Sequence, residues 1–448
     1  GISDAQCYYD ALRGRFVALC FTTGTTYSWF YLAVSKTNDA RGAWWLYKFD
    51  MTKNGSTPAN VWADYQSLGI SDDKIAMTGQ MYGLNGGSYL YQKVRVLDRA
   101  AIYAGQSTGY FDFVNWDAPT GGTYQDLFCT KAARNLTAGD NDLHLLCIPV
   151  GGSVTVTSTT IFGPPSAPIM TMPQLVPVRA FGPPLPPAQK GSTQTVPITD
   201  CRPTDFYVRD GVLSVAFHES ISLGGLVSAI RFLQLRMSDN AVVHDETYAA
   251  SGTWLFFPAV VTDSVGTVYL GFDRSSATEY PSSYATCMRR GESTLQSSTL
   301  LKVGVSPTLA SRWGDYTGID NDVAASGPGG SVAWYAGQYV KGTYTFGTWI
   351  QRLSITYGQI AGTVYDDCDG SAASTSDRTP LAGVTLALQQ GGVTKQLAVT
   401  DANGAFNFGW LESGTYDVVV TAPSGGTAVD AATGTGGRSE ERRVGKEC

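Results

Sequence analysis

Two short segments of this 448-residue chain place an aspartate between a tryptophan and a tyrosine. They are "VWADYQSLGI" at 61–70 and "SRWGDYTGID" at 311–320, which contain Asp64 and Asp315. Two carboxylates that face one cavity can act as an acid/base pair in glycosidic bond cleavage, or can bind Ca²⁺, which prefers several oxygen ligands. Alternatively, each aspartate accepts backbone N–H bonds in the turn that leads into its strand. The spacing leaves both interpretations open.

The residues around these aspartates extend the candidate site. An arginine three residues before Asp315 either clamps an acidic ligand or pairs with a neighbouring carboxylate. The aromatic residues offer flat surfaces on which sugars stack, although aromatic side chains also dominate packed cores. The candidate catalytic residues are Asp64, Asp315, Arg312 and Tyr316. The candidate ligand-binding residues are Trp62, Trp313 and Tyr65, with Trp334 and Tyr335 as further aromatics.

Other catalytic patterns receive less support from the sequence. The segment "GQSTG" (105–109) fits the GxSxG form of a nucleophile elbow, but no helical pattern follows Ser107, and that motif needs a strand-to-helix turn. The segment "TDSVGTVY" (262–269) approaches the Ser-x-Asp-x-Gly-x-Thr-Trp turn of sialidases, but its glycine comes one residue late and the tryptophan is missing. The three histidines are far apart in sequence and are expected to have single structural roles.

The elements that must position these residues are β-strands, because alternation of apolar and polar residues dominates the chain. A unit of two apolar strands around an Asp/Gly turn, followed by one or two further strands, recurs every 50 to 60 residues. Such units must stack face to face to bury their apolar surfaces, and radial stacking gives a β-propeller. Six blades are predicted, at 1–52, 61–104, 110–163, 194–248, 252–306 and 311–357. Asp64 and Asp315 then belong to the first strands of two blades, nearest the central axis.

The composition restricts the compartment and the partners. Charged residues make up 15% of the chain, against about 25% in average soluble proteins, and the net charge is −7 without a basic stripe. A nucleic-acid partner is therefore not expected, and neither is a membrane-spanning segment, because no apolar run approaches about 18 residues. Cys7 with Cys20, and Cys129 with Cys147, flank candidate hairpins, so they form either cross-strand disulfides in an oxidising compartment or free thiols.

The propeller segments also resemble a known family. "YYDALRGRFVAL" (8–19), "WADYQSLGI" (62–70) and "SRWGDYTGID" (311–320) occur in the same order in a family of large secreted bacterial β-propeller proteins of unassigned activity. The resemblance covers nearly all of residues 1–357. It implies further strands before residue 1, so the sequence is expected to be truncated at its N-terminus, with a seventh blade or a ring-closing strand in the intact protein.

The sequence after Tyr357 has a different pattern of five short strands, which predicts a small prealbumin-like or immunoglobulin-like β-sandwich at 358–425. "GTVYDDCDG", "TPLAGV" and "TDANGAF" resemble carboxypeptidase-regulatory-like and B-type surface-repeat modules, which act as stalks on secreted and surface proteins and carry no catalysis. The resemblance suggests a calcium loop. Its candidate metal ligands are Asp367, Asp369 and Asp377. Residues 426–448 are expected to be a disordered tail with a non-native end.

The sequence thus predicts an all-β protein with a β-propeller at 1–357 and a C-terminal β-sandwich. It favours a secreted or cell-surface binding and scaffold protein that presents the propeller to an extracellular polysaccharide or protein ligand. The alternative is a propeller enzyme, a glycoside hydrolase or polysaccharide lyase that uses carboxylates of the central funnel. Fold does not decide between them, so catalysis stays open. Convergence of Asp64, Asp315, Arg312 and a tyrosine on one pocket would favour the enzyme.

Overall fold

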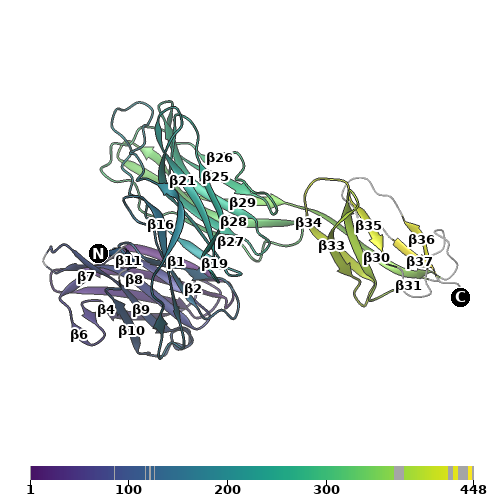
Figure 1. The fold of residues 1–448 in the computed structure, drawn as a ribbon, viewed down its shortest axis with the longest axis horizontal. Helices are drawn as coiled ribbons and strands as arrows, with labels where there is room; N and C mark the ends of the chain where they lie inside the picture. The colour runs from purple at the N-terminus through teal and green to yellow at the C-terminus, as the bar shows by residue number, and fades with distance from the viewer. Residues whose placement is uncertain are drawn as a thin grey trace. The chain divides into compact units, whose positions relative to one another are not determined.

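The computed structural model describes residues 2–84, 86–116, 118–120, 123–125, 127–367, 378–421, 427–431 and 442–445, and consists almost entirely of β-strands (Figure 1). The chain forms two compact units, residues 1–321 with 334–351 and residues 322–333 with 352–448. The single helix among the described residues is α1 (Arg99–Tyr103), capped by the Asp98 carboxylate. Within that part of the chain, no helix combines the length and the apolar character that crossing a membrane would take.

The first unit is built from antiparallel sheets that follow one another along the chain. The first sheet contains β1 (Ser3–Asp10), β2 (Arg15–Thr23), β3 (Ser28–Ser35) and β4 (Trp44–Asp50), and the small hairpin of β5 (Lys53–Asn54) and β6 (Thr57–Pro58) follows it. The second contains β7 (Val61–Ile70), β8 (Lys74–Gly83), β9 (Tyr89–Asp98) and β10 (Tyr110–Val114), followed by the pair of β11 (Ala118–Thr120) and β12 (Thr123–Gln125). The third contains β13 (Lys131–Ala132), β15 (Leu143–Cys147), β16 (Ser153–Phe162), β17 (Ile169–Met170) and β18 (Gln174–Phe181).

Three more groups of strands follow. The fourth contains β19 (Phe206–Arg209), β20 (Val212–Ser222), β21 (Leu226–Arg236) and β22 (Ala241–Tyr248), and a short parallel strand joins it to the second group in one nine-stranded sheet. The fifth contains β23 (Thr253–Thr262), β24 (Val268–Ser276), β25 (Glu279–Met288) and β26 (Thr299–Lys302). The sixth contains β27 (Gly318–Asn321), β28 (Gly330–Gly342) and β29 (Thr345–Thr356), of which residues 330–333 and 352–356 belong to the second unit.

The first strands of successive sheets lie beside one another, as in a β-propeller. The short strand β14 (Arg134–Asn135) pairs in parallel with both β7 and β19, so the inner strands of three sheets run in one direction. β7 also contacts β1 and β13, and β23 contacts β19 and β27. The predicted all-β propeller of six blades is confirmed, but the predicted bounds of the third blade, 110–163, are wrong. Residues 110–114 form β10, which pairs with β9 of the second blade, and the third group of strands runs from residue 131 to residue 181.

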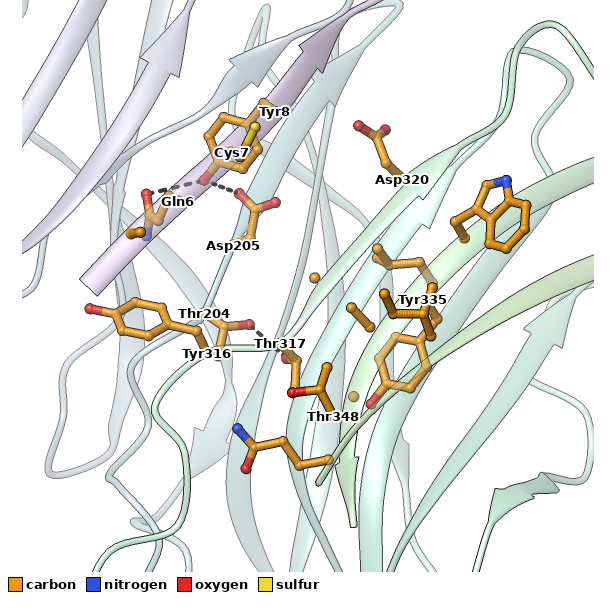
Figure 2. Close-up of a pocket in the computed structure, with 18 of the residues that line it drawn as sticks. Gln6, Cys7, Tyr8, Thr204, Asp205, Tyr316, Thr317, Asp320, Tyr335 and Thr348 are labelled. Atoms are coloured by element: carbon orange, nitrogen blue, oxygen red, sulfur yellow. Dashed lines mark hydrogen bonds between the residues drawn. The ribbon is translucent and has the colours of Figure 1, made fainter. Parts of the chain in front are cut away.

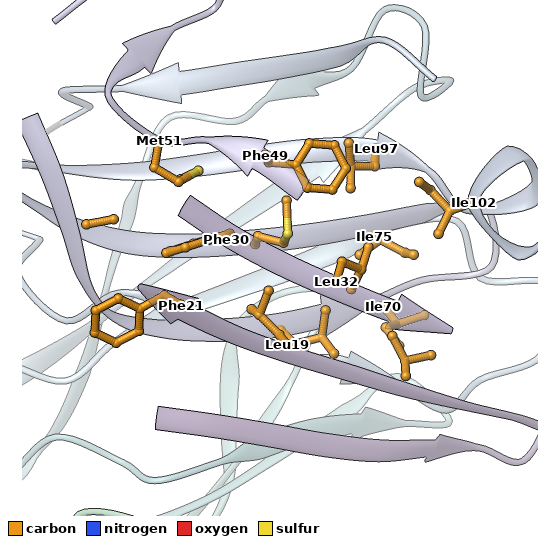
Figure 3. Close-up of a cluster of buried hydrophobic side chains, with 14 of the residues drawn as sticks. Leu19, Phe21, Phe30, Leu32, Phe49, Met51, Ile70, Ile75, Leu97 and Ile102 are labelled. Atoms are coloured by element: carbon orange, nitrogen blue, oxygen red, sulfur yellow. The ribbon is translucent and has the colours of Figure 1, made fainter. Parts of the chain in front are cut away.

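A dry apolar seam joins the first two blades. β2 and β3 bury alternate residues, because successive side chains of a strand point to opposite faces. These residues meet the apolar face of β7 and β8 in one cluster (Figure 3). The cluster includes Leu19, Phe21, Phe30, Leu32, Ile70 and Ile75, all at most 5% exposed.

The inner strand β7 changes face midway. Val61 and Ala63 contribute to the seam before residue 64, and Leu68 and Ile70 contribute after residue 67. The register with β8 shifts between Asp64 and Ser67, and Tyr65 has a φ of 48°. An extra residue in one strand is a β-bulge, and it reverses which positions face the core.

The second unit is a β-sandwich, as predicted, but it extends beyond the predicted end at residue 425. The expectation of a disordered tail at 426–448 is wrong for residues 427–431 and 442–445, which form two strands that add to the sandwich. Its apolar core lies between the sheet that contains β30 and β34 and the sheet that contains β32, and includes Val364, Leu386, Leu388, Phe406 and Phe408. The strands of this unit are β30 (Gly358–Asp367), β31 (Arg378–Pro380), β32 (Thr385–Gln390), β33 (Val393–Val399), β34 (Ala405–Leu411), β35 (Asp417–Val420), β36 (Thr427–Ala431) and β37 (Arg442–Gly445).

The disulfide expectation is wrong for both hairpins in the structure. Cys7 lies opposite Ala18, because the turn between β1 and β2 is centred one position earlier than a Cys7–Cys20 pairing requires. Both thiols are free. Cys129 is also a free thiol, so the bridge to Cys147 is not formed.

Candidate functional site

The inner ends of several blades enclose an acidic cavity of about 580 Å³. Its residues come from β1, β2, β7, the segment before β19 and the segment before β27. They are Ser3, Asp4, Phe21, Asp64, Tyr65, Thr199, Asp200, Arg202, Arg312 and Asp315. A cavity of this size lies within the usual range for small-ligand pockets, and we call it the acidic cavity.

Two β-bulges bring Asp4, Asp64 and Tyr65 to this cavity. β1 shifts register against β2 between Ser3 and Gln6, with Asp4 at a φ of 52°, just as β7 shifts around Tyr65. The two bulges are tied together, because Gln6 Nε2 donates to the Gln66 carbonyl at 3.3 Å and Gln66 Nε2 donates to the Asp4 carbonyl. A positive φ is strained for residues other than glycine, so the fold holds these two positions in place.

Ion pairs with arginines neutralise two of the carboxylates in the cavity. Arg202 binds both carboxylate oxygens of Asp200, at 2.8 and 2.6 Å. Arg312, whose side chain is 76% exposed, pairs with Asp315. The guanidinium of each arginine thus faces a carboxylate of its own segment. Asp4 and Asp64 remain as carboxylates with no arginine of their own, so the cavity is acidic on balance.

Asp64 is the carboxyl group most suited to carry a proton. It is partly buried, and desolvation raises its pKa above the ordinary value, helped by the neighbouring charge of Asp4. The positive charges of Arg202 and Arg312 oppose this rise. A carboxylic acid with a raised pKa beside a second carboxylate is the arrangement of acid/base catalysis.

Two tyrosines and a lysine form the floor beside the carboxylates. The rings of Tyr65 and Tyr316 stack with centroids 5.7 Å apart, and Tyr316 donates its hydroxyl to Asp4 Oδ2 at 2.9 Å. The buried Lys131 places Nζ 4.1 Å from the centroid of the Tyr65 ring and donates to the Thr204 carbonyl at 3.0 Å. Burial lowers the pKa of Lys131 to about 8. These contacts fix the orientation of both phenol rings.

The structure brings together most of the residues singled out in the sequence. Asp64, Asp315, Arg312 and Tyr65 line the acidic cavity, and Tyr316 contacts it through Asp4. Arg312 pairs with a neighbouring carboxylate, which was one of its two expected roles. The convergence of two acids, the arginine and a tyrosine on one pocket is the arrangement that favours the enzyme interpretation.

The two candidate tryptophans, Trp62 and Trp313, lie in different environments. Trp313 is 2% exposed, and its indole N–H donates to the buried Asp273 at 2.8 Å, so it takes the packed-core position that was the alternative to ligand binding. Trp62 is partly exposed and stacks on Tyr82 with ring centroids 5.0 Å apart. Because it lies two residues before Asp64, it projects from the same face of β7 as that aspartate.

Sequence reasoning missed Asp4, Asp200, Arg202 and Lys131. One signal was present, because Asp4-Ala5-Gln6 repeats the Asp-x-Gln spacing of Asp64-Tyr65-Gln66. The two glutamines are the residues that join the bulges. The other three depend on contacts between blades, and no local spacing announces them.

Ca²⁺ binding is the other chemistry that the sequence pattern of Asp64 and Asp315 allows. Among the described residues, no three His, Cys, Asp or Glu side chains lie close enough together to hold a metal ion. Asp367 ends strand β30, and Asp369 and Asp377 of the predicted calcium loop lie outside the described residues.

Comparison with known proteins finds a family match for the second unit. Residues 358–443 match the model of the SdrD B-like domain family, which supports the predicted B-type surface-repeat module. No curated protein matches the sequence significantly.

Solved structures resemble the chain only distantly. The polysaccharide lyase Uly1 has a TM-score of 0.38 at 10% identity, covering 78% of this chain and 89% of its own. A PL25 ulvan lyase bound to -[GlcA(1-4)Rha3S]- has a TM-score of 0.38 at 11% identity, covering 89% and 90%. The sialidase of Trypanosoma rangeli has a TM-score of 0.39 at 7% identity, covering 79% of this chain and 55% of its own. Likeness at this level assigns no activity to the chain.

Proposed function

We propose that the propeller is a carbohydrate-active enzyme that hydrolyses glycosidic bonds in the acidic cavity. The observation that carries the proposal is the pairing of Asp64, whose pKa is raised by burial, with Asp4 in one ligand-sized cavity. Asp64 protonates the leaving oxygen, and Asp4 serves as the second carboxylate that such chemistry needs. Tyr316 holds Asp4 in position through its hydroxyl.

The charge of the cavity defines the substrate class. Asp200 and Asp315 are paired with arginines, while Asp4 and Asp64 are not. A polyanionic sugar would meet excess negative charge here, so we propose a neutral or amine-bearing polysaccharide. The same reasoning favours hydrolase over lyase chemistry, because elimination next to a uronate requires cationic groups free to neutralise the carboxylate.

The second unit supports a proposal for the location of the protein. A B-type surface-repeat module on the same chain supports a secreted or cell-surface protein, in which the sandwich acts as a stalk and the propeller meets an extracellular polysaccharide. A binding and scaffold role without catalysis uses the same cavity, and the experiment below separates the two.

The test is a reducing-end assay on purified protein with chitosan, β-1,4-glucan, mannan and alginate. We expect new reducing ends from at least one neutral or amine-bearing polymer and none from alginate. Asp64→Asn should lower the rate at least a hundredfold, because a positioned general acid contributes about 10²- to 10⁴-fold. Asp239→Asn is the matched control, because this exposed aspartate pairs with Arg236 away from the cavity.

Both variants are checked by circular dichroism and thermal melting, so that unfolding is recognised. Binding of a polymer without cleavage would establish the scaffold role and overturn the enzyme proposal. Equal rates for the wild type and Asp64→Asn would remove Asp64 as the acid. If the wild type neither binds nor cleaves these polymers, the proposed function fails.

A further inference from the structure

A second cavity, of about 350 Å³, lies next to the acidic cavity in the propeller (Figure 2). β1 lines one side of it, and β27, β28 and β29 line the other. Tyr316 joins the two cavities, because it lines the second while its hydroxyl donates to Asp4 of the first. We call this space the side cavity.

The side cavity has a charged base. Arg134, which is 3% exposed, donates to Asp205 and to Asp320 at 2.9 Å each. Tyr8 donates its hydroxyl to Asp205 at 3.3 Å (Figure 2). The Tyr8 ring lies 4.5 Å from the Arg134 guanidinium. One buried guanidinium therefore holds both carboxylates in place at the base of the cavity.

The walls above this base combine aromatic and hydroxyl groups. Trp334, 45% exposed, and Ile350 contribute apolar surface. Thr204, Thr317 and Thr348 contribute hydroxyl groups (Figure 2). An apolar wall opposite fixed carboxylates and hydroxyls suits a pyranose, which has an apolar face and a rim of hydroxyl groups.

We propose that the side cavity binds a further sugar unit of the same polysaccharide, so that the enzyme cleaves inside the polymer chain. This inference rests on the proposed function. The Asp4–Tyr316 hydrogen bond lies between the two cavities, and a chain that occupies the acidic cavity continues past Tyr316 toward Arg134 and Asp320. Asp320 and Asp205 accept sugar hydroxyls there, and Trp334 packs against the ring.

The experiment measures affinity as a function of chain length. The probes are dimers and hexamers of two series, glucosamine oligosaccharides and cello-oligosaccharides. Each is titrated into the Asp64→Asn protein by calorimetry, because this variant should bind the sugar without cleaving it. We expect a hexamer to bind at least tenfold more tightly than the dimer of the same sugar. Thr348→Trp, which fills the side cavity from an exposed position on β29, should reduce hexamer affinity to that of the dimer and leave the dimer unchanged.

Two further variants keep the result interpretable. Thr345→Trp adds the same ring to an exposed position of β29 outside the cavity lining, and should change neither affinity. Asp320→Asn should weaken only the hexamer, by about threefold to tenfold. The side-cavity proposal would be overturned if hexamer and dimer bound with equal affinity, or if neither Thr348→Trp nor Asp320→Asn changed the affinity for the hexamer. Cleavage by the wild type would still uphold the proposed function in that case. Absence of cleavage by the wild type would remove both.

Discussion

The seam between the first two blades and the acidic cavity are built by the same strands, yet they differ in chemistry. β7 supplies Ala63 and Leu68 to the dry seam, and Asp64 and Tyr65 to the cavity. Strict alternation could not do this, because it would keep all even positions on one face. The bulge at Tyr65 moves the strand from one surface to the other.

The same device recurs in β23. Leu255 and Val260 both belong to one apolar cluster although their positions differ in parity, and Phe257 between them has a φ of 49°. The register with β24 shifts between Phe256 and Ala259. Here the bulge presents aromatic groups, whereas in β1 and β7 it presents carboxylates. The bulge therefore creates an inward-facing position, and the residue types decide whether that position becomes core or site.

Replacing Asp4 should have the largest effect on the cavity. We expect Asp4→Asn to lower hydrolysis about 10²- to 10⁴-fold, because the second carboxylate is lost. It should also lower the pKa of Asp64, since the charge of Asp4 raises it. The general acid must be protonated, so the activity that remains should be lost at a lower pH than in the wild type. A pH–rate profile measures both effects, and an unshifted alkaline limb would contradict the coupling.

Replacing Leu32 should have the largest effect on the seam. Leu32 is 1% exposed and packs among the side chains of the first two blades. We expect Leu32→Ala to lower the free energy of unfolding by about 2 to 5 kcal/mol, measured by urea denaturation. The rate per folded molecule should stay within about twofold of the wild type. A large loss of activity in molecules that remain folded would show that seam and cavity are not separable.

His218 connects the β23 bulge to a segment that lines the acidic cavity, and its titration should make the stability of the protein depend on pH. Its Nδ1–H donates to the Asp200 carbonyl at 2.9 Å, and Nε2 accepts from the Phe257 N–H at 2.5 Å. Burial lowers its pKa from 6.5 to about 4. The unfolded chain then takes up a proton first as pH falls, so we expect stability to be constant above pH 6.5 and to fall by about 3 kcal/mol towards pH 4.

His218→Gln should remove most of this pH dependence and lower stability at neutral pH. His144→Gln is the matched control between pH 4 and 6.5, because His144 contacts Thr160 and Asp140 rather than the cavity segment, and the lowered pKa of Asp140 affects stability only below that range. A pH dependence that survives in His218→Gln would assign it to other groups.

The second unit offers a further contrast, because its candidate metal ligands belong to the calcium loop that the sequence predicts. If Asp367, Asp369 and Asp377 bind Ca²⁺, EDTA should destabilise the sandwich by about 3 kcal/mol relative to Ca²⁺ at a hundred times its dissociation constant. Scanning calorimetry should show this shift in one transition and leave the propeller transition in place. Asp369→Asn should reproduce it, and transitions that ignore EDTA would remove the calcium proposal.

The sequence predicted the architecture better than the site, for physical reasons that particular residues illustrate. The alternation of buried and less buried residues in β2 and β3 depends on the local sequence, so the strands of the blades could be predicted. Asp64 and Asp315 stood out because each lies in a Trp-x-Asp-Tyr pattern, but the burial of Trp313 against Asp273 depends on a partner 40 residues away. A register shift such as that around Tyr65 leaves only a brief break in alternation, so the residues it turns inward could not be identified beforehand.

The smallest effect on stability is expected at the rim of the cavity, where Arg312 pairs with Asp315. Because the Arg312 side chain is 76% exposed, solvent screens the pair, and Arg312→Gln should change the free energy of unfolding by less than about 1 kcal/mol. The same change leaves Asp315 unpaired at the cavity and adds to its negative charge. We therefore expect amine-bearing oligosaccharides to bind more tightly to the variant and neutral ones to bind as before, measured by calorimetry. Weaker binding of both would mean that Arg312 contacts the sugar itself, and the rim would then belong to the binding surface rather than to its electrostatic surroundings.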